Sequence, residues 1–297
     1  IAVAVGYGVM LLWDVILLYQ YFPQGEKGAF LFLRWVDQFL PLAFTGLFIN
    51  IGLFAHLVIM WVGPLQVQVQ GLFVGAPYHD VPALVAFLTI LVTTVNFVVS
   101  VEVNFYPKYK NYYSLFNDKG AVGDITQAGE EMLKVLNVEL KYTALKQLLA
   151  TALAVSLGGL LLEYVPLGFN DLMEGYFRTL CVGYGIYAVA NTILLLLLYF
   201  TDYKGALAAS GCFAGGTVLF TVISLFFPRV YYGFGFLTGS AVFFLIAAFR
   251  LDYYTKRLPY YILSVQPVVA REKRGKFSRL GFFLSKKLER SQNSEKI

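Results

Sequence analysis

Five neutral polar side chains recur at helical spacing along an otherwise apolar stretch of the sequence. They stand four, three, four and four positions apart, which places them in one stripe along a helix. They are Thr89, Thr93, Asn96, Ser100 and Asn104. Polar groups are costly in lipid, so such a stripe should face a cavity or another helix. Hydroxyls and amides exchange hydrogen bonds readily with sugars, so the stripe is a candidate lining for a sugar path. Hydrogen bonding between packed helices is the alternative.

Charged residues inside apolar stretches are the second possible source of chemistry. Glu174 and Arg178 form an i,i+4 pair, and Arg178 either contacts a transported ligand or serves the pair structurally. Asp14 and Glu102 are candidates to carry a coupling proton, or to pair with basic residues at the inner membrane interface. His56 stands alone in its stretch and is interpreted as a packing residue.

Motifs for catalysis and cofactor binding are missing from the sequence. It contains no Gly-x4-Gly-Lys-Ser/Thr phosphate loop, no His-Glu-x-x-His zinc motif and no Asp-x-Asp pair for a metal-bound diphosphate. Two histidines cannot build a histidine-rich metal site, and Cys181 and Cys212 lack metal or redox spacing. We therefore expect no catalytic residue, no metal and no cofactor, and we predict that the chain is not an enzyme.

Long apolar helices must position these residues. Hydrophobic residues make up 58% of the chain and charged residues 14%, and the mean hydropathy is +0.66. Seven runs are long enough to cross about 30 Å of hydrocarbon. They are 1–22, 39–62, 82–105, 142–164, 173–200, 205–227 and 231–251. The predicted fold class is all-α, a polytopic transmembrane helix bundle. The first run opens at Ile1 without a Met, so we expect the natural start to lie upstream.

Positive charge is distributed unevenly between the two ends of these runs. All but three of the 23 lysines and arginines fall in the connections after the first, third and fifth runs or in the C-terminal tail. Of those three, Arg229 lies on the opposite side, whereas Lys146 and Arg178 lie within runs. The basic side should be cytoplasmic, which places the C-terminus in the cytoplasm. The net charge of +5 thus has a topological cause, and no nucleic-acid partner is expected.

Two of the expected cytoplasmic segments have helical apolar stripes. An amphipathic helix over 118–141, within a cytoplasmic segment near 106–141, should run into the fourth span. Its stripe is Met132, Val135, Leu136 and Leu140. The tail carries Phe277, Leu280, Leu284 and Leu288 among Lys276, Arg279, Lys286, Lys287 and Arg290. That helix could lie on anionic membrane lipid, dock on a cytoplasmic partner, or remain solvated.

Four long strings in the sequence resemble the PelG family of inner-membrane exopolysaccharide exporters. The strings span Phe105–Gly120, Leu167–Arg178, Tyr199–Tyr203 and Phe249–Tyr254. The resemblance extends across essentially the whole chain. It implies the multidrug/oligosaccharidyl-lipid/polysaccharide flippase superfamily, whose members have two six-helix lobes around a cavity that opens alternately to either side of the membrane.

The resemblance also implies a domain plan, a substrate and partners. Residues 1–22 would be the last helix of the first lobe, 23–263 the six-helix second lobe, and 264–297 a basic cytoplasmic tail. The substrate would be a hexosamine-rich polysaccharide that comes from a cytoplasmic glycosyltransferase. The partners would be PelF, PelD and PelE, the glycosyltransferase and membrane scaffold subunits, in the bacterial inner membrane. No ligand residue is carried over by the resemblance.

Other functions on the same scaffold are alternatives to this one, and each makes its own demand on the sequence. An ion-coupled exporter of small molecules or of lipid-linked oligosaccharides would need a titrating carboxylate such as Asp14 or Glu102. A membrane glycosyltransferase would need the acidic metal motif that is missing. A non-transporting anchor for a synthase can be distinguished from an exporter only by a transport assay.

Overall fold

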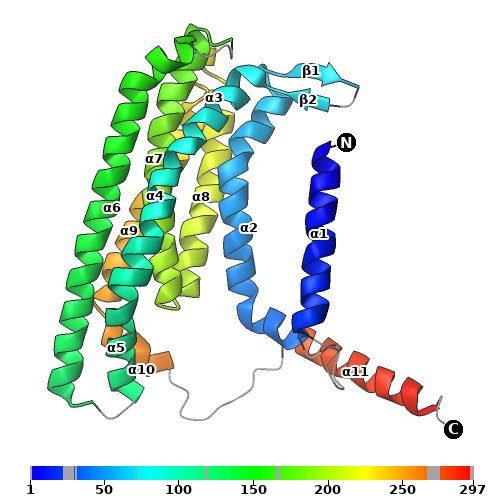
Figure 1. Cartoon of the computed structure of the whole chain (residues 1–297), viewed down its shortest axis with the longest axis vertical. Coiled ribbons are helices and arrows are strands. Elements are labelled where there is room, and N and C mark those ends of the chain that lie inside the picture. The colour runs from blue at the N-terminus through cyan, green and yellow to red at the C-terminus, as the bar shows by residue number, and fades with distance from the viewer. Residues whose placement is uncertain are drawn as a thin grey trace. The chain divides into compact units, whose positions relative to one another are not determined.

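The computed structural model of the chain describes residues 2–22, 30, 32–71, 73–117, 120–164, 168–265 and 275–294. The described part is almost entirely helical, with one small hairpin (Figure 1). The long helices are α1 (Ala2–Tyr21), α2 (Leu33–Val62), α6 (Val122–Tyr164), α7 (Asp171–Tyr199), α8 (Tyr203–Ser224), α9 (Phe234–Thr255) and α11 (Lys276–Ser294). The shorter elements are β1 (Val67–Gln70), β2 (Phe73–Gly75), α3 (Pro77–Phe87), η1 (Leu88–Ile90), α4 (Leu91–Phe97), η2 (Val98–Phe105), α5 (Tyr106–Asn117), η3 (Arg229–Tyr231) and α10 (Leu258–Val265).

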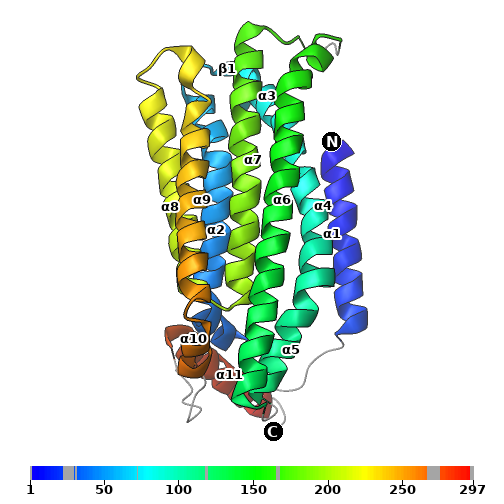
Figure 2. The same cartoon turned by 90° about the vertical axis from the view of Figure 1, so that its left-hand side faces the viewer.

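The chain divides into two compact units, one of residues 41–266 and one of residues 1–40 with 267–297. In the larger unit α7 is the central helix, since it packs against α3, α6, α8 and α9. Figure 2 shows α7 between α6 and α9. The sequence of α7 is typical of a buried helix. Most of its glycine, alanine and aromatic residues are buried, and so are most of the leucines near its C-terminal end.

Five helices of the described chain are long and apolar enough to cross a membrane. They are Leu33–Val62, Pro77–Phe116, Asp171–Tyr199, Tyr203–Ser224 and Arg229–Thr255. The all-α, polytopic fold class is therefore confirmed. The expected runs 1–22 and 142–164 lie in helices α1 and α6, which are not among the five, so the count of seven stays a prediction.

Two of these helices depart from regular geometry. Helix α2 begins at Leu33 rather than at 39 and carries a kink, with Phe39 at φ −109° and ψ 15°, because Pro41 cannot donate a backbone hydrogen bond. The third span is a composite of α3, η1, α4, η2 and α5, in which a 3₁₀ turn and a π-helical segment follow one another. Such π segments inside α-helices often occur at functional sites.

Helix α6 joins the predicted amphipathic segment and the predicted fourth span in one helix of 43 residues. Met132 and Leu136 of the predicted stripe are buried, and α6 packs there against α5. Gly129 permits this close approach, because a Cβ at that position would meet the ring of Tyr112.

The smaller unit contains α1, the first turns of α2, and α11. The carboxylate of Asp37 accepts hydrogen bonds from the backbone N–H and the hydroxyl of Ser278, both at 2.7 Å, and from the N–H of Phe277 at 3.3 Å. Asp37 thereby caps α11, which places a negative charge at a helix N-terminus. Phe277 and Leu280 of the predicted stripe are exposed, and the side chain of Leu288 lies outside the described residues.

Candidate functional site

The stripe of the third span meets a matching stripe on α6, and together they form a polar seam inside the bundle. We use "polar seam" for Thr89, Thr93, Asn96 and Ser100 of the third span with Thr143, Lys146, Gln147 and Thr151 of α6. Six of the eight residues have 9% or less of their surface exposed, the exceptions being Thr89 and Lys146. The seam is thus a buried, mostly neutral row of hydrogen-bonding groups.

Side-chain hydrogen bonds close the seam at two levels. At one level Thr93 Oγ1 donates to Gln147 Oε1 at 2.7 Å, and Gln147 Nε2 donates to Thr151 Oγ1 at 3.2 Å. At the next level Asn96 Nδ2 donates to Thr143 Oγ1 at 2.7 Å and to Ser100 Oγ at 3.1 Å.

The α6 half of the seam was missed in the sequence analysis, although a signal for it is present. Thr143, Gln147 and Thr151 stand four residues apart, so they share one helical face as the stripe residues do. Hydrogen bonds between polar side chains on neighbouring membrane helices stabilise their packing. In this conformation the stripe therefore contacts another helix, and its part in a path stays a prediction.

Lys146 links the seam to an open groove on the surface of the bundle. Its ammonium donates to Asn96 Oδ1 at 2.5 Å, while the side chain itself is exposed. The groove has a volume of about 540 Å³ and is lined by Leu91, Val92, Val95, Asn96, Val99 and Lys146. A solute in this groove would meet one cation and one amide against an apolar wall.

The remaining stripe residue and the predicted charges have separate partners. Asn104 donates to Glu139 at 2.9 Å, and Glu102 accepts from the hydroxyl of Tyr199 at 2.5 Å. Arg178 and Glu174 form an i,i+4 ion pair at 2.5 Å on α7. Among the described residues no hydrogen bond or ion pair joins Arg178 to the polar seam.

Asp14, the other predicted coupling carboxylate, lies exposed on α1 in the smaller unit. Neither its candidate coupling role nor that of Glu102 or Glu174 is tested by these contacts.

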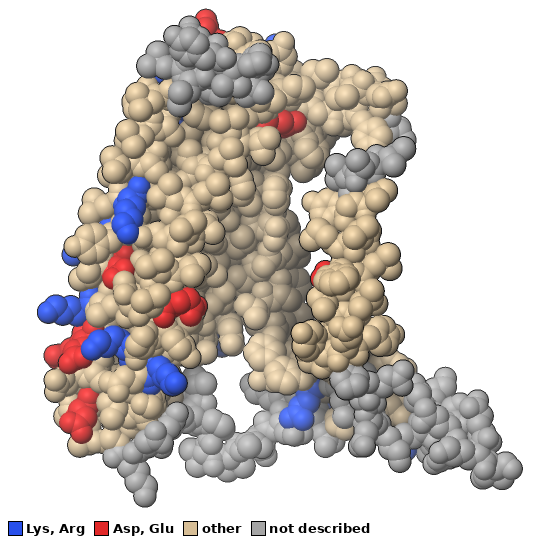
Figure 3. All heavy atoms as spheres, in the orientation of Figure 1, with Lys and Arg blue, Asp and Glu red and all other residues tan. Residues whose placement is uncertain are grey.

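Charged side chains gather beyond the seam, over α5 and the adjoining half of α6, on the face drawn in Figure 3. There Lys108 donates to Glu131 at 2.9 Å. This hydrogen bond and the lysine charge lower the pKa of the Glu131 carboxyl. Both side chains are nearly half exposed, so the pair belongs to a solvated end of the bundle.

A second buried polar cluster lies where α2, α3, α7 and α9 meet. His56 was interpreted as a lone packing residue, but the structure places it against His79, with ring centroids 5.1 Å apart. Both rings are fully buried. This contact was hard to predict from the sequence, since the β1–β2 hairpin separates the two residues along the chain.

An ion pair joins two of the strings that carry the family resemblance. Arg250 of α9 contacts Asp202 in the α7–α8 turn twice, at 2.5 and 2.8 Å. Asp202 also accepts from the backbone N–H of Gly205 at 3.2 Å and so caps α8. The turn requires a left-handed backbone conformation at Thr201, whose φ is 61°.

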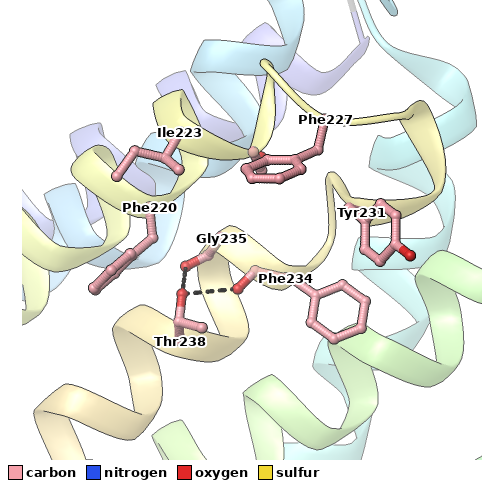
Figure 4. Close-up of a pocket in the computed structure, with 8 residues that line it drawn as sticks. Phe220, Ile223, Phe227, Tyr231, Phe234, Gly235 and Thr238 are labelled. Carbon is pink, nitrogen blue, oxygen red and sulfur yellow. Dashed lines mark hydrogen bonds between the residues drawn. The ribbon is translucent and has the colours of Figure 1, made fainter.

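An aromatic pocket of about 520 Å³ lies between α8 and α9 near the connection that joins them (Figure 4). Phe220, Phe227, Tyr231 and Phe234 form most of its wall. The hydroxyl of Thr238 donates to the carbonyls of Phe234 and Gly235, so it is already bonded to its own helix. The pocket is therefore almost entirely apolar.

The described residues contain no group of three or more histidine, cysteine, aspartate or glutamate side chains that could hold a metal ion. What the arrangement offers is hydrogen bonding along a buried seam, together with a buried pair of imidazole rings.

Comparison with known proteins gives one match. Residues 1–263 match the model of the family PelG, described as "Putative exopolysaccharide Exporter (EPS-E)". No curated protein and no solved structure matches the chain.

Proposed function

The chain belongs to the PelG family of exopolysaccharide exporters, and on this premise we propose that it carries a hexosamine-rich polysaccharide out through the inner membrane. The family match over residues 1–263 is the observation that carries this proposal. The apolar helices of a membrane protein and the neutral character of the polar seam support it.

The polar seam suits a polysaccharide because its groups are numerous, all neutral except Lys146, and already paired. Each hydrogen bond in it contributes about 0.5–1.5 kcal/mol net. A sugar hydroxyl or acetamido group can replace Gln147 as the partner of Thr93, or Thr143 as the partner of Asn96. Other hydroxyls of the same polymer can pair with the released Gln147 and Thr143, so the third span and α6 can separate at little cost when polymer enters. The seam is thus proposed as a part of the path that opens.

The groove at Lys146 is proposed as the place where the polymer first meets this path. It adjoins Asn96, so a sugar bound there lies next to the seam without any helix moving. Arg178 is proposed as a further lining residue in a state where its pair with Glu174 is released.

The chain is proposed to act within a synthase complex. A cytoplasmic glycosyltransferase (PelF) would deliver the polymer, and the scaffold subunits PelD and PelE would hold the two together. The charge asymmetry supports a cytoplasmic C-terminus. The domain plan of 1–22, 23–263 and a tail at 264–297 is proposed on the basis of the family resemblance.

The experiment links the two helices across the seam by a reversible bond. Asn96→Cys and Thr143→Cys are introduced together after Cys181 and Cys212 have been replaced, and the pair is oxidised in cells that make the polymer. We expect secreted polymer to fall at least tenfold at unchanged membrane levels and to return after reduction. The controls are the single variants Asn96→Cys and Thr143→Cys, which cannot form the cross-link between the helices and should keep their export after oxidation.

Full export by the cross-linked variant would show that the path does not open at the seam. The export function itself is tested separately, by removing the chain from producing cells. Polymer should then remain inside, and unchanged secretion of hexosamine polymer would overturn the proposal.

A further inference from the structure

Two histidines, the only two of this chain, meet edge to face inside the larger unit. His56 comes from α2 and His79 from α3, and their planes are inclined by 69°. Aromatic rings enclose them, with Phe236 at 4.5 Å from His56 and Tyr176 at 5.6 Å from His79. A wholly apolar ring would pack among these aromatic side chains without burying polar nitrogens, so apolar packing alone does not explain two titratable rings.

The polar atoms of this histidine pair are mostly unpaired. His56 Nε2 lies 3.3 Å from the hydroxyl of Tyr184, whereas both ring nitrogens of His79 are buried without a hydrogen-bond partner. Buried polar atoms are rarely left unsatisfied, and those that are call for an explanation. A free nitrogen lone pair on each ring is the chemical requirement for binding a proton.

The carboxylate nearest to the pair in sequence belongs to Asp80, which follows His79 on α3. Its Oδ2 accepts from the indole N–H of Trp61 and the backbone N–H of Ala76, each at 2.9 Å. Adjacent residues of a helix do not face each other, and among the described residues no hydrogen bond or ion pair joins Asp80 to either ring. An imidazolium in this enclosure would therefore lack a bonded counter-charge.

The other facing groups are neutral or turned away. Helix α7 contributes the phenols Tyr176 and Tyr184, and α9 contributes Phe236. The connection from α8 to α9 brings Tyr232 and Arg229, and the Arg229 carbonyl accepts from Tyr176 at 2.5 Å while its side chain is exposed. None of these groups provides a second negative charge.

We propose that His56 and His79 form the site at which this exporter binds a proton and couples its uptake to polymer export. The inference rests on the export function proposed above. One proton adds to an unoccupied imidazole nitrogen, no other reactant is needed, and the proton leaves again from the same pair. Two imidazolium rings at this spacing would repel each other, so the pair should hold one proton at a time.

The coupling follows from the enclosure of the pair. A charged ring is unfavourable among Phe236, Tyr176 and Tyr184, and becomes favourable once α2 and α3 separate from α7 and α9 and water reaches the site. A proton therefore selects the separated state, because a ligand shifts an equilibrium by its differential affinity for the two states.

The pair also lies close to one end of its helices. His56 is six residues before the end of α2, or roughly 9 Å at 1.5 Å per residue, and His79 is in the first turn of α3. On the proposed orientation this end faces outside, so a proton can enter down its gradient.

The first experiment needs no substitution. The chain is produced with ¹⁵N-histidine, so that every labelled ring belongs to the pair, and its nitrogen shifts are followed by solid-state NMR in lipid bilayers from pH 8 to pH 4. We expect one imidazolium per chain to form, with both rings changing together. Two rings that stay neutral throughout, or that both become charged independently, would overturn the proposal.

The second experiment measures export at matched membrane levels with and without a protonophore. His56→Gln and His79→Gln should each reduce secreted polymer at least tenfold. Phe236→Leu, which alters the packing but not the titratable groups, should keep the one-proton titration. Wild-type export that stops with the protonophore, together with normal export by both glutamine variants, would place coupling elsewhere and refute the inference. If producing cells secrete the same amount of polymer after the chain is removed, the proposed function fails, while the NMR result still decides proton binding.

Discussion

The ion pair between Arg250 and Asp202 should contribute more to stability than any other ion pair described in the structure. Arg250→Met would leave Asp202, which is 6% exposed, with a buried and uncompensated charge. Breaking a buried pair in this way costs about 3–5 kcal/mol. For a domain of this size about 2–4 °C accompanies each kcal/mol, so the melting temperature should fall by about 6–20 °C.

The assay can use a cysteine already present in the chain. Cys181 is buried on α7 and reacts with a thiol-sensitive fluorophore only after the bundle opens, provided that the exposed Cys212 is replaced. The purified protein is heated in detergent with the fluorophore, and the midpoint of Cys181 labelling is recorded. The labelling curve thus reports directly on α7, the central helix of the larger unit.

The matched control lies at the C-terminal end of the same helix, where Lys256 is the C-cap residue of α9. Lys256→Met breaks an ion pair with Asp252 whose side chains are 71% and 60% exposed, and such an i,i+4 pair contributes no more than about 0.5 kcal/mol. The double variant Arg250→Met with Asp202→Asn should recover part of the loss, because the remaining group is then neutral. A shift below about 2 °C in Arg250→Met, or no recovery in the double variant, would refute this reasoning.

Four further outcomes are expected. Single cysteines at Gln68 and Ser291 should differ in their reactivity in intact cells. The cysteine at Gln68 should react with an impermeant thiol reagent and the one at Ser291 should not; labelling at Ser291 would contradict the predicted topology. Thr93→Ala should lower secreted polymer by less than about twofold, since it removes one hydrogen bond; complete loss of export would point to a specific binding site instead. Glu102→Gln should also export normally, because an amide still accepts from the Tyr199 hydroxyl, and a block there would move proton coupling away from the histidine pair. Asp37→Ala should destabilise α11 by about 0.5–2 kcal/mol, measured as faster amide exchange in its first turn; unchanged exchange would show that the cap contributes nothing.

The helical spacing in the sequence predicted which residues share a face, but not what that face meets. Thr93 and Asn96 were placed in one stripe correctly, because the spacing of polar residues follows from helix geometry alone. Their partners Thr143 and Gln147 lie about 50 residues away on α6, and that contact depends on how the helices pack. The i,i+4 spacing on α6 is visible in the sequence, but the sequence does not show that the two stripes contact each other.

The histidine pair and the ion pair were hidden for a related reason. His56 looked isolated because His79 follows a hairpin, and Arg250 lies 48 residues from Asp202. Contacts between distant helices leave no periodic signal in either segment. The 3₁₀ and π segments of the third span were also unforeseen, since hydrophobic patterning does not distinguish these helix types at the resolution of single turns.

The length of α6 has a mechanical consequence. Its 43 residues span about 65 Å at 1.5 Å per residue, whereas a bilayer with its headgroups is about 40–45 Å thick. At least about 20 Å of this one helix therefore extends past the lipid, where α5 accompanies it beyond the ends of α7 and α8 (Figure 1). A rigid rod converts a small tilt at one point into a larger sweep at its tip. A displacement of α6 by about 1 Å at the seam would thus become a larger displacement at its projecting end. Conversely, a force applied to that end would exert a torque on the seam.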